Sequence, residues 1–160
     1  MNTSKITPYL WFDGNAEQAV EYYTTLFSGS KVTQVARWGE GGPGPKGSVM
    51  NIAFELDGRP FIALNGGPHF KFTPAISMFV SCDSQEEVDR YWTRFLADGG
   101  KASQCGWLED KFGLSWQIVP TKLVTLMSDP DPKRAGRVAQ ALMKMQKIDL
   151  AALERAHEGA

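Results

Sequence analysis

The sequence predicts an α+β protein built from two tandem β-α-β-β-β units with C-terminal helices. A strand-like segment followed by a capped amphipathic helix occurs twice in the same register, and three strand-like segments follow each copy. A shared register of strand, cap and apolar stripe favours duplication of one unit over chance similarity. We expect a single domain over residues 1–160, with units at 6–66 and 74–120 and a helical tail at 131–158.

The first unit begins with residues 6–12, whose aromatic and branched side chains are typical of a strand. A helix is expected next, with Asn15 as its N-cap and Gln18 as the reciprocal capping partner. Its apolar residues recur at helical spacing and are Ala16, Ala19, Val20, Tyr23 and Phe27. Strands are predicted at 31–38, 49–56 and 60–65, and Asp57-Gly58 favours a two-residue hairpin between the last two.

The second unit repeats this pattern 68 residues later. The shift places Asn15 on Asp83, Gln18 on Glu86, Val20 on Val88, Tyr23 on Tyr91 and Phe27 on Phe95. Strands are predicted at 75–82, 101–104, 107–109 and 114–119. The offset shortens to about 53 between the turns at 57–60 and 110–113, so the first unit carries extra residues. The Gly- and Pro-rich stretch 39–47 accounts for them, and we expect it to be flexible and unable to pack, as a mobile flap or a linker.

A tail of two short helices is predicted beyond the duplication. Asp131 and Pro132 are typical of an N-cap and first-turn proline, and Val138, Ala141, Leu142 and Met145 form the apolar side. Asp149 caps the last helix, with Ile148 and Leu153 placed to staple it. The tail either covers an exposed edge of its own chain or packs on a partner subunit.

The composition is that of a soluble globular protein. Hydrophobic residues make up 42% and charged residues 22%, and a net charge of −1 gives no reason to expect nucleic acid or an anionic membrane as partner. We find neither a secretory signal nor an apolar run of about twenty residues. Cys82 and Cys105 match neither a zinc-ligand pair nor a redox CxxC, so we expect reduced thiols and a cytoplasmic location.

Several segments resemble one known family. Thr7-Pro8-Tyr9-Leu10, Ala63-Leu64-Asn65-Gly66-Gly67-Pro68, Phe70-Lys71-Phe72, Pro74-Ala75-Ile76-Ser77 and 112–120 (FGLSWQIVP) are similar to the PhnB-like branch of the vicinal oxygen chelate superfamily. This superfamily includes glyoxalase, bleomycin-resistance proteins and extradiol dioxygenases, and the branch is often labelled 3-demethylubiquinone-9 3-methyltransferase. The resemblance implies cupped mixed sheets, a small-molecule cavity between the units or across a dimer, and a homodimer.

The resemblance also implies where a metal would bind. Metal-using relatives take four His or Glu ligands from the first and fourth strands of each unit, which corresponds here to Pro8, Leu64, Ala75 and Gln117. The neighbouring residues Tyr9, Asn65, Ser77 and Trp116 do not supply such ligands either. We therefore expect no catalytic metal and no cofactor.

Catalytic candidates are few. His69, between the units, is a general base or polar anchor in one interpretation and an exposed loop residue in the other. His157 lies in the last helical turn, which we expect to fray. Pairing of Cys105 with His69 has no sequence signature, whereas Cys82 is expected to be a small buried hydrophobe. No glycine-rich turn typical of enzymes using S-adenosylmethionine follows the first strand, and 39–47 lacks the Gly-Lys-Ser/Thr of a phosphate loop.

The remaining feature is an aromatic cavity. Trp11, Trp38, Trp116, Phe54 and Phe61 either line it or fill the core, and polar groups are offered by Asn65, Ser115 and Gln117. We select as ligand-binding residues Trp11, Trp38, Asn65, His69, Trp116 and Gln117. The sequence thus favours metal-independent binding of an aromatic or hydrophobic small molecule. The alternative is an enzyme, either the methyltransferase of the family label or a glyoxalase-like isomerase or lyase.

Overall fold

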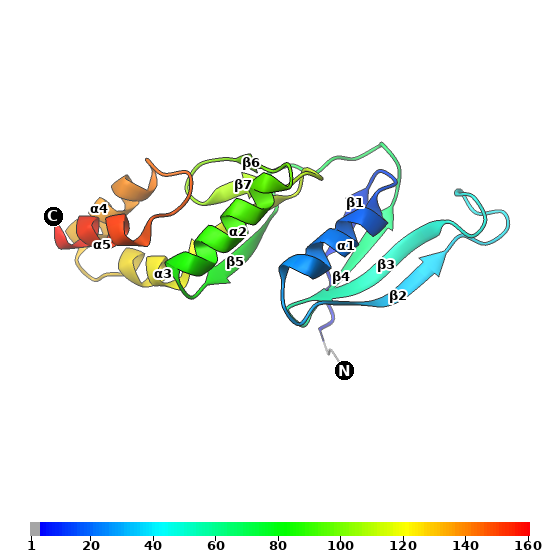
Figure 1. The fold of residues 1–160 in the computed structure, drawn as a ribbon, viewed down its shortest axis with the longest axis horizontal. Coiled ribbons are helices and arrows are strands. Elements are labelled where there is room, and N and C mark those ends of the chain that lie inside the picture. Colours follow the sequence, from blue (N-terminus) through cyan, green and yellow to red (C-terminus); the bar gives the residue numbers. More distant parts are fainter. Residues whose placement is uncertain (1–3) are drawn as a thin grey trace. The chain divides into compact units, whose positions relative to one another are not determined.

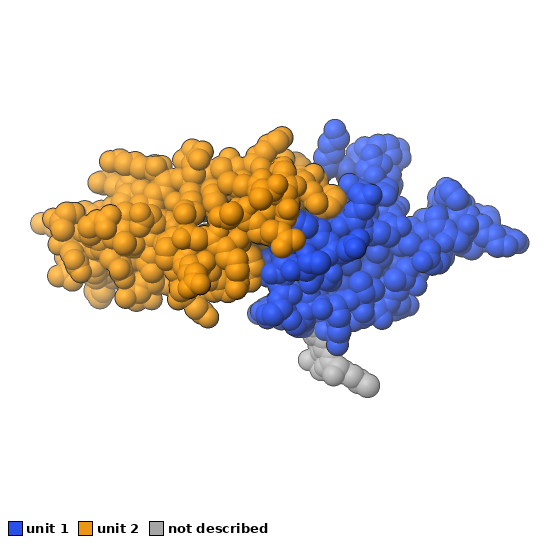
Figure 2. All heavy atoms as spheres, viewed as in Figure 1, with its two compact units in different colours: residues 1–71 blue, residues 72–160 orange. Residues whose placement is uncertain are grey.

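The computed structural model describes residues 4–160, and residues 1–3 of the expected domain lie outside this range. The chain divides between Lys71 and Phe72 into two compact units, coloured separately in Figure 2. Each unit contains a four-stranded mixed sheet with one helix packed along it, and the second unit also contains the C-terminal helices (Figure 1). The predicted α+β class with two β-α-β-β-β units is therefore confirmed. No helix within residues 4–160 has the length and apolar character needed to span a bilayer.

The first unit matches the predicted order of elements. They are β1 (Tyr9–Phe12), α1 (Ala16–Leu26), β2 (Lys31–Arg37), β3 (Val49–Leu56) and β4 (Arg59–Asn65). The sheet order is β1-β4-β3-β2, with β1 parallel to β4 and the other pairs antiparallel. Asp57 and Gly58 both have positive φ, at 49° and 73°, which confirms the tight hairpin between β3 and β4. Strand β1 starts three residues later than expected, because Pro8 has no N–H for the ladder.

The second unit has the same topology, but its β6 and β7 are much shorter than β2 and β3 of the first unit. Its elements are β5 (Ser77–Cys82), α2 (Gln85–Ala97), β6 (Lys101–Ala102), β7 (Trp107–Glu109) and β8 (Ser115–Pro120). The sheet order is β5-β8-β7-β6, again with one parallel pair, β5 with β8. The duplication inferred from the sequence therefore extends to strand order and strand direction.

The helix caps differ from the predicted pair. Asn15 is the N-cap of α1, but its side chain makes no capping hydrogen bond, and the Asn65 amide oxygen from β4 accepts the Ala16 N–H at 2.9 Å instead. In α2 the cap is Ser84, whose Oγ accepts the Glu87 N–H at 3.2 Å. The predicted capping roles of Asp83 and Glu86 are therefore wrong, because Ser84 is the N-cap and the Glu87 carboxylate accepts the Asp83 N–H at 2.7 Å. The Gln18 side chain makes no capping hydrogen bond among the described residues, and Asn65 supplies the side-chain acceptor at the start of α1.

The C-terminal segment forms three helices rather than two. The short α3 (Thr121–Met127), which was not predicted, follows β8 directly and precedes α4 (Pro132–Leu142) and α5 (Leu150–Glu158). Asp131 and Asp149 cap the latter two as expected, through the N–H groups of Lys133 and Ala152. The helices enclose one core cluster of Val119, Leu123, Leu126, Val138, Ile148 and Leu153. Ile148 and Leu153, the predicted staple, are both fully buried in this cluster.

The tail is joined to the rest of its unit by polar contacts as well. The Gln85 side chain at the start of α2 donates to the Ile148 carbonyl at 2.9 Å and accepts the Leu150 N–H at 2.7 Å. Lys147 forms an ion pair with Asp89 of α2 at 2.7 Å. This ion pair and the hydrogen bond from Gln85 lower the pKa of the Asp89 carboxyl. The tail therefore covers the β-α-β-β-β part of the second unit of its own chain.

Candidate functional site

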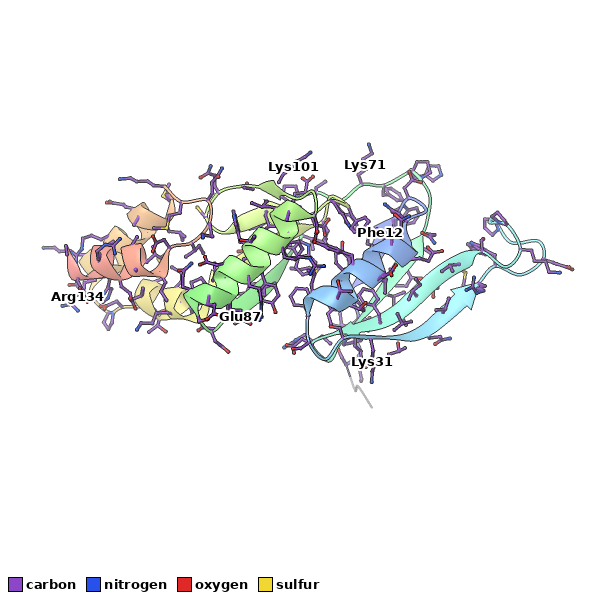
Figure 3. The ribbon with its side chains drawn as sticks, viewed as in Figure 1. Phe12, Lys31, Lys71, Glu87, Lys101 and Arg134 are labelled. Carbon is purple, nitrogen blue, oxygen red and sulfur yellow. The ribbon has the colours of Figure 1, made fainter. Side chains whose placement is uncertain are left out.

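Each sheet has one face covered by its helix and a second face, here called the open face. In the first unit, Leu10, Phe12, Phe54 and Ala63 are buried on the α1 side, and Phe12 is labelled in Figure 3. Because side chains alternate along a strand, Tyr9 and Trp11 of β1 lie on the open face. Ile62 and Leu64 of β4 pair with them in register and share that face.

The open face of the first unit combines an exposed aromatic ring with polar groups. Tyr9 is 53% exposed, and its hydroxyl lies 3.3 Å from the Asn51 amide nitrogen, which donates to it from β3. Phe54 and Phe61 stack on each other at 5.5 Å, with Phe54 buried on the α1 side. Of the aromatic residues expected to line a cavity, Phe54 therefore lies in the core.

Trp11 is held by the loop that follows β4. Its indole N–H donates to the Gly67 carbonyl at 2.8 Å, and its ring meets Phe70 edge-on at 4.9 Å. The backbone of Gly66 passes so close that an added Cβ would lie 2.3 Å from an indole carbon. The glycine pair of the Asn65-Gly66-Gly67 motif thus allows the loop to close on the tryptophan.

Replacement of Gly66 by alanine is expected to lower the free energy of unfolding by about 1–3 kcal/mol, because the methyl group would force the indole to move. Chemical denaturation followed by tryptophan fluorescence would measure this loss. The matched control is Gly39→Ala, since a Cβ there meets nothing within 4 Å. Equal stabilities of the two variants would contradict the close packing described for Trp11.

Asn65, selected from the sequence as a ligand-binding residue, has a set of structural partners. Its amide nitrogen donates to Glu17 at 2.8 Å and to the Val49 carbonyl at 3.1 Å, while its oxygen caps α1. The side chain therefore lies on the helix side of the sheet and joins β3, β4 and the start of α1.

Trp38 lies under the glycine-rich turn that joins β2 to β3. A Cβ at Gly44 or Gly42 would lie 2.3 Å or 2.8 Å from its ring, so both glycines pack on the indole. The backbone N–H of Trp38 donates to the Ser48 carbonyl, and the backbone N–H of Gly47 donates to the Trp38 carbonyl. Lys46 forms an ion pair with Glu40. The prediction that residues 39–47 are unable to pack is wrong, because the absence of side chains is what allows this approach.

In the second unit, Trp116 of β8 lies on the face covered by α2. The residues next to it in β8 therefore point to the open face. The Trp116 ring packs 5.1 Å from Phe95 of α2, and the residue is 3% exposed. Its indole N–H donates at 2.8 Å to Asp110, a carboxylate buried in the turn between β7 and β8. Trp116, selected as a ligand-binding residue, therefore occupies the core position that the sequence left open as an alternative.

Gln117, the next residue, points to the open face. Its amide nitrogen donates to the Ser77 hydroxyl at 2.9 Å, and Phe79 of β5 and Trp107 of β7 are its in-register neighbours. Phe79 is 53% exposed. Ser77 and Phe79 were not selected from the sequence, although the 68-residue shift aligns them with Tyr9 and Trp11 and could have found them.

The two histidines lie in different settings. His69 is exposed in the loop after β4. His157 is largely buried, with its Nε2 2.7 Å from Asp129, and Arg137 donates to the carbonyls of Ala156 and His157. The expectation that the last turn frays is wrong, because this network fastens it. The Asp131 N–H, and after it His157, lower the pKa of the Asp129 carboxyl.

Cys82 is fully buried at the end of β5, as expected, and Cys105 is partly exposed with a positive φ of 59°. Burial, followed by the charge of Glu87 (Figure 3), raises the pKa of the Cys82 thiol from 9.0 to about 12. The thiol is therefore protonated at neutral pH, so a small hydrophobic role fits it.

The raised pKa predicts a pH dependence of stability. Between pH 9 and 12 the unfolded thiol loses its proton while the folded one keeps it, so the free energy of unfolding should fall as pH rises through this window. Denaturation at stepped pH, compared with Cys82→Ala, would isolate the effect. A similar decline in both proteins would disprove it.

In the native protein at pH 8, a thiol reagent should modify Cys105 and leave Cys82 unmodified.

The residues at the family's metal positions do not fit a metal site. Of the positions that the resemblance implies, Pro8 and Ala75 precede β1 and β5, while Leu64 and Gln117 lie on β4 and β8. The strand residues nearest to Pro8 and Ala75 on the open faces are Tyr9 and Ser77. Hydroxyls, an amide and an alkyl group are weak or incapable ligands for a catalytic transition metal. Within residues 4–160, no three His, Cys, Asp or Glu side chains are grouped so as to hold an ion.

Comparison with known proteins agrees with this fold. A PhnB protein from Bacillus cereus is 36% identical, with a TM-score of 0.67 over 74% of this chain and all of that one. Protein PA1353 from Pseudomonas aeruginosa, at 22% identity, has a TM-score of 0.60 over 74% of this chain and 98% of its own. None of the curated proteins compared with the chain matches it.

A more distant structure shows the fold alone. The fosfomycin resistance protein FosX from Listeria monocytogenes, complexed with Mn(II) and sulfate, is 15% identical, with a TM-score of 0.51 over 72% of this chain and 88% of that one.

The family model described as 3-demethylubiquinone-9 3-methyltransferase matches residues 4–119, which end before the C-terminal helices. The chain therefore belongs to this PhnB-like family.

Proposed function

We propose that this PhnB-like protein binds an aromatic or hydrophobic small molecule without the help of a metal ion. The observation that carries the proposal is the make-up of the open faces, which present aromatic rings beside hydroxyl and amide groups on strands where the family resemblance would imply His and Glu in a metal-using protein. Tyr9 and Phe79 are each about half exposed on these faces. Exposed aromatic rings beside a few polar anchors are typical of small-molecule binding surfaces.

The polar groups give these surfaces selectivity. Asn51 orients the Tyr9 hydroxyl, and Gln117 is oriented by Ser77, so each open face offers a placed hydrogen-bonding pair next to an aromatic ring. Of the residues selected from the sequence, we retain Trp11 and Gln117 as ligand-binding candidates. The Trp11 ring also packs edge-on against Phe70. His69 stays a candidate polar anchor because its side chain is exposed.

Binding is tested with the whole protein purified without chelators. Native mass spectrometry of protein from its own host should show a retained small molecule and no stoichiometric metal. One divalent ion per chain in elemental analysis would overturn the metal-independent part of the proposal. The same spectra report the homodimer, which we propose from the family resemblance.

The second candidate function is the methyl transfer named in the family description, and glyoxalase-like isomerase or lyase chemistry is the further enzymatic alternative. S-adenosylmethionine tests the first directly, because a ligand at a hundred times its dissociation constant adds about 2.7 kcal/mol to stability. A higher melting temperature at millimolar cofactor would favour the transferase. An unchanged melting temperature, together with a retained aromatic compound, would favour binding.

A further inference from the structure

Three side chains form one row across the open face of the second unit. Gln117 of β8 pairs in register with Phe79 of β5 on one side and with Trp107 of β7 on the other. In-register neighbours on adjacent strands point to the same face, with Cβ atoms about 5 Å apart. The row therefore places a carboxamide between two aromatic rings.

The hydrogen bond between Gln117 and Ser77 fixes how this amide is presented. The amide nitrogen donates to the Ser77 Oγ at 2.9 Å, and the Gln117 Oε1 accepts no hydrogen bond from residues 4–160. The Ser77 hydroxyl, having accepted from Gln117, keeps its own proton for donation. The pair therefore offers an acceptor, Gln117 Oε1, next to a donor, the Ser77 O–H.

The surroundings of the row favour a neutral ligand of limited size. In the adjacent row, Glu109 of β7 pairs in register with Lys101 of β6, which is labelled in Figure 3. The two side chains carry opposite charges, so this row adds no net charge to the open face. On the other side, Val119, on the same face as Gln117, is 4% exposed within the cluster formed by the C-terminal helices. These helices therefore cover the end of the strand next to the row.

We infer that this row recognises a planar ring carrying an N–H or O–H donor directly beside a carbonyl acceptor, as in a lactam. The ring would lie against Phe79 and Trp107, the ligand's donor would meet Gln117 Oε1, and its carbonyl would accept from Ser77. Burying such an edge against the complementary pair satisfies both polar groups, whereas a ligand without the donor leaves the Gln117 oxygen unpaired. The inference rests on the proposed function and adds the chemical class of the ligand.

The test compares two probes that differ by one methyl group. 2-Quinolone has an N–H beside its carbonyl, and N-methyl-2-quinolone keeps the ring and the carbonyl but lacks the donor. Isothermal titration with the full-length protein should show 2-quinolone binding about tenfold or more tightly than its N-methyl form. Quenching of tryptophan fluorescence should accompany binding, since Trp107 lies in the row.

Variants then assign the preference to the proposed pair. Gln117→Leu should abolish the difference between the two probes while leaving the weak binding of N-methyl-2-quinolone in place, and Ser77→Ala should reduce binding of both. Ser81→Ala, an exposed residue of β5 outside the row, should leave both affinities unchanged.

The outcomes separate this inference from the proposed function. Equal affinity for the two probes, or a preference that survives Gln117→Leu, overturns the inference while aromatic binding itself stands. Failure of both quinolones to bind, while another flat hydrophobic ring such as naphthalene binds, likewise overturns the ligand class alone. If no aromatic compound binds and none is retained from the host, the proposed function fails with it.

Discussion

Replacing Asp110 with alanine should destabilise the protein by more than about 3 kcal/mol, because the carboxylate accepts three hydrogen bonds in a buried site. Its Oδ1 accepts the N–H groups of Phe112 and Leu114 at 2.8 and 3.1 Å, and its Oδ2 accepts the Trp116 indole N–H at 2.8 Å. Asp110 is 3% exposed, so water cannot replace these bonds. Unfolding in urea, followed by tryptophan fluorescence, would measure the loss.

A milder substitution keeps the experiment readable if the alanine variant does not fold. Asp110→Asn retains one acceptor oxygen for the two backbone groups but turns an NH₂ toward the indole N–H, so we expect a loss of about 2 kcal/mol. The control is Asp98→Asn, which weakens a partly exposed ion pair with Arg94 and should cost less than about 1 kcal/mol. Equal losses in the two asparagine variants would show that the Asp110 network contributes little.

Gly106 is the second position where a small change should have a large effect. Its φ is +83°, and an added Cβ would lie 2.7 Å from the Ile148 Cδ1 and 3.0 Å from the Ile118 carbonyl oxygen. Gly106→Ala should therefore cost about 2–4 kcal/mol, combining left-handed strain with overpacking. Thermal unfolding should show a correspondingly lower midpoint.

Gly113→Ala provides a matched control for the backbone strain. Gly113 has a φ of +89° with nothing within 4 Å of an added Cβ, so this variant should lose only the conformational share, about 1 kcal/mol. The difference between the variants then reports the contact of the tail with the loop between β6 and β7. If both variants unfolded at the same temperature, Ile148 would not be seated on Gly106. Hydrogen exchange at 145–150 should also be faster in Gly106→Ala, because the Gly106 N–H donates to the Gln146 carbonyl.

The strand and helix order could be predicted from the sequence because its signals are local. The alternation of β3 and the Asp57-Gly58 turn lie in a few consecutive residues, and β3 and β7 were predicted with the bounds that the structure shows. Asp131 and Asp149 were identified as caps because a cap bonds to the backbone two or three residues away.

The candidate site was less predictable because the sidedness of a strand depends on the rest of the fold. Trp116 and Gln117 were selected together, yet alternation sends one to the helix and the other to the open face, and only the contact with Phe95 shows which. Asn65 resembled a polar ligand-binding group, but its partners lie 16 and about 48 residues away. Such long-range hydrogen bonds leave no local signal.

What the sequence by itself determined is the duplicated β-α-β-β-β plan and its PhnB-like membership, since each follows from residue types at given places. Tertiary structure alone decided which face each aromatic ring occupies, that Asn65 caps α1, and that the tail folds back onto α2 and Gly106. These features depend on atoms brought together from distant positions, because packing and hydrogen bonding act through space and not along the chain.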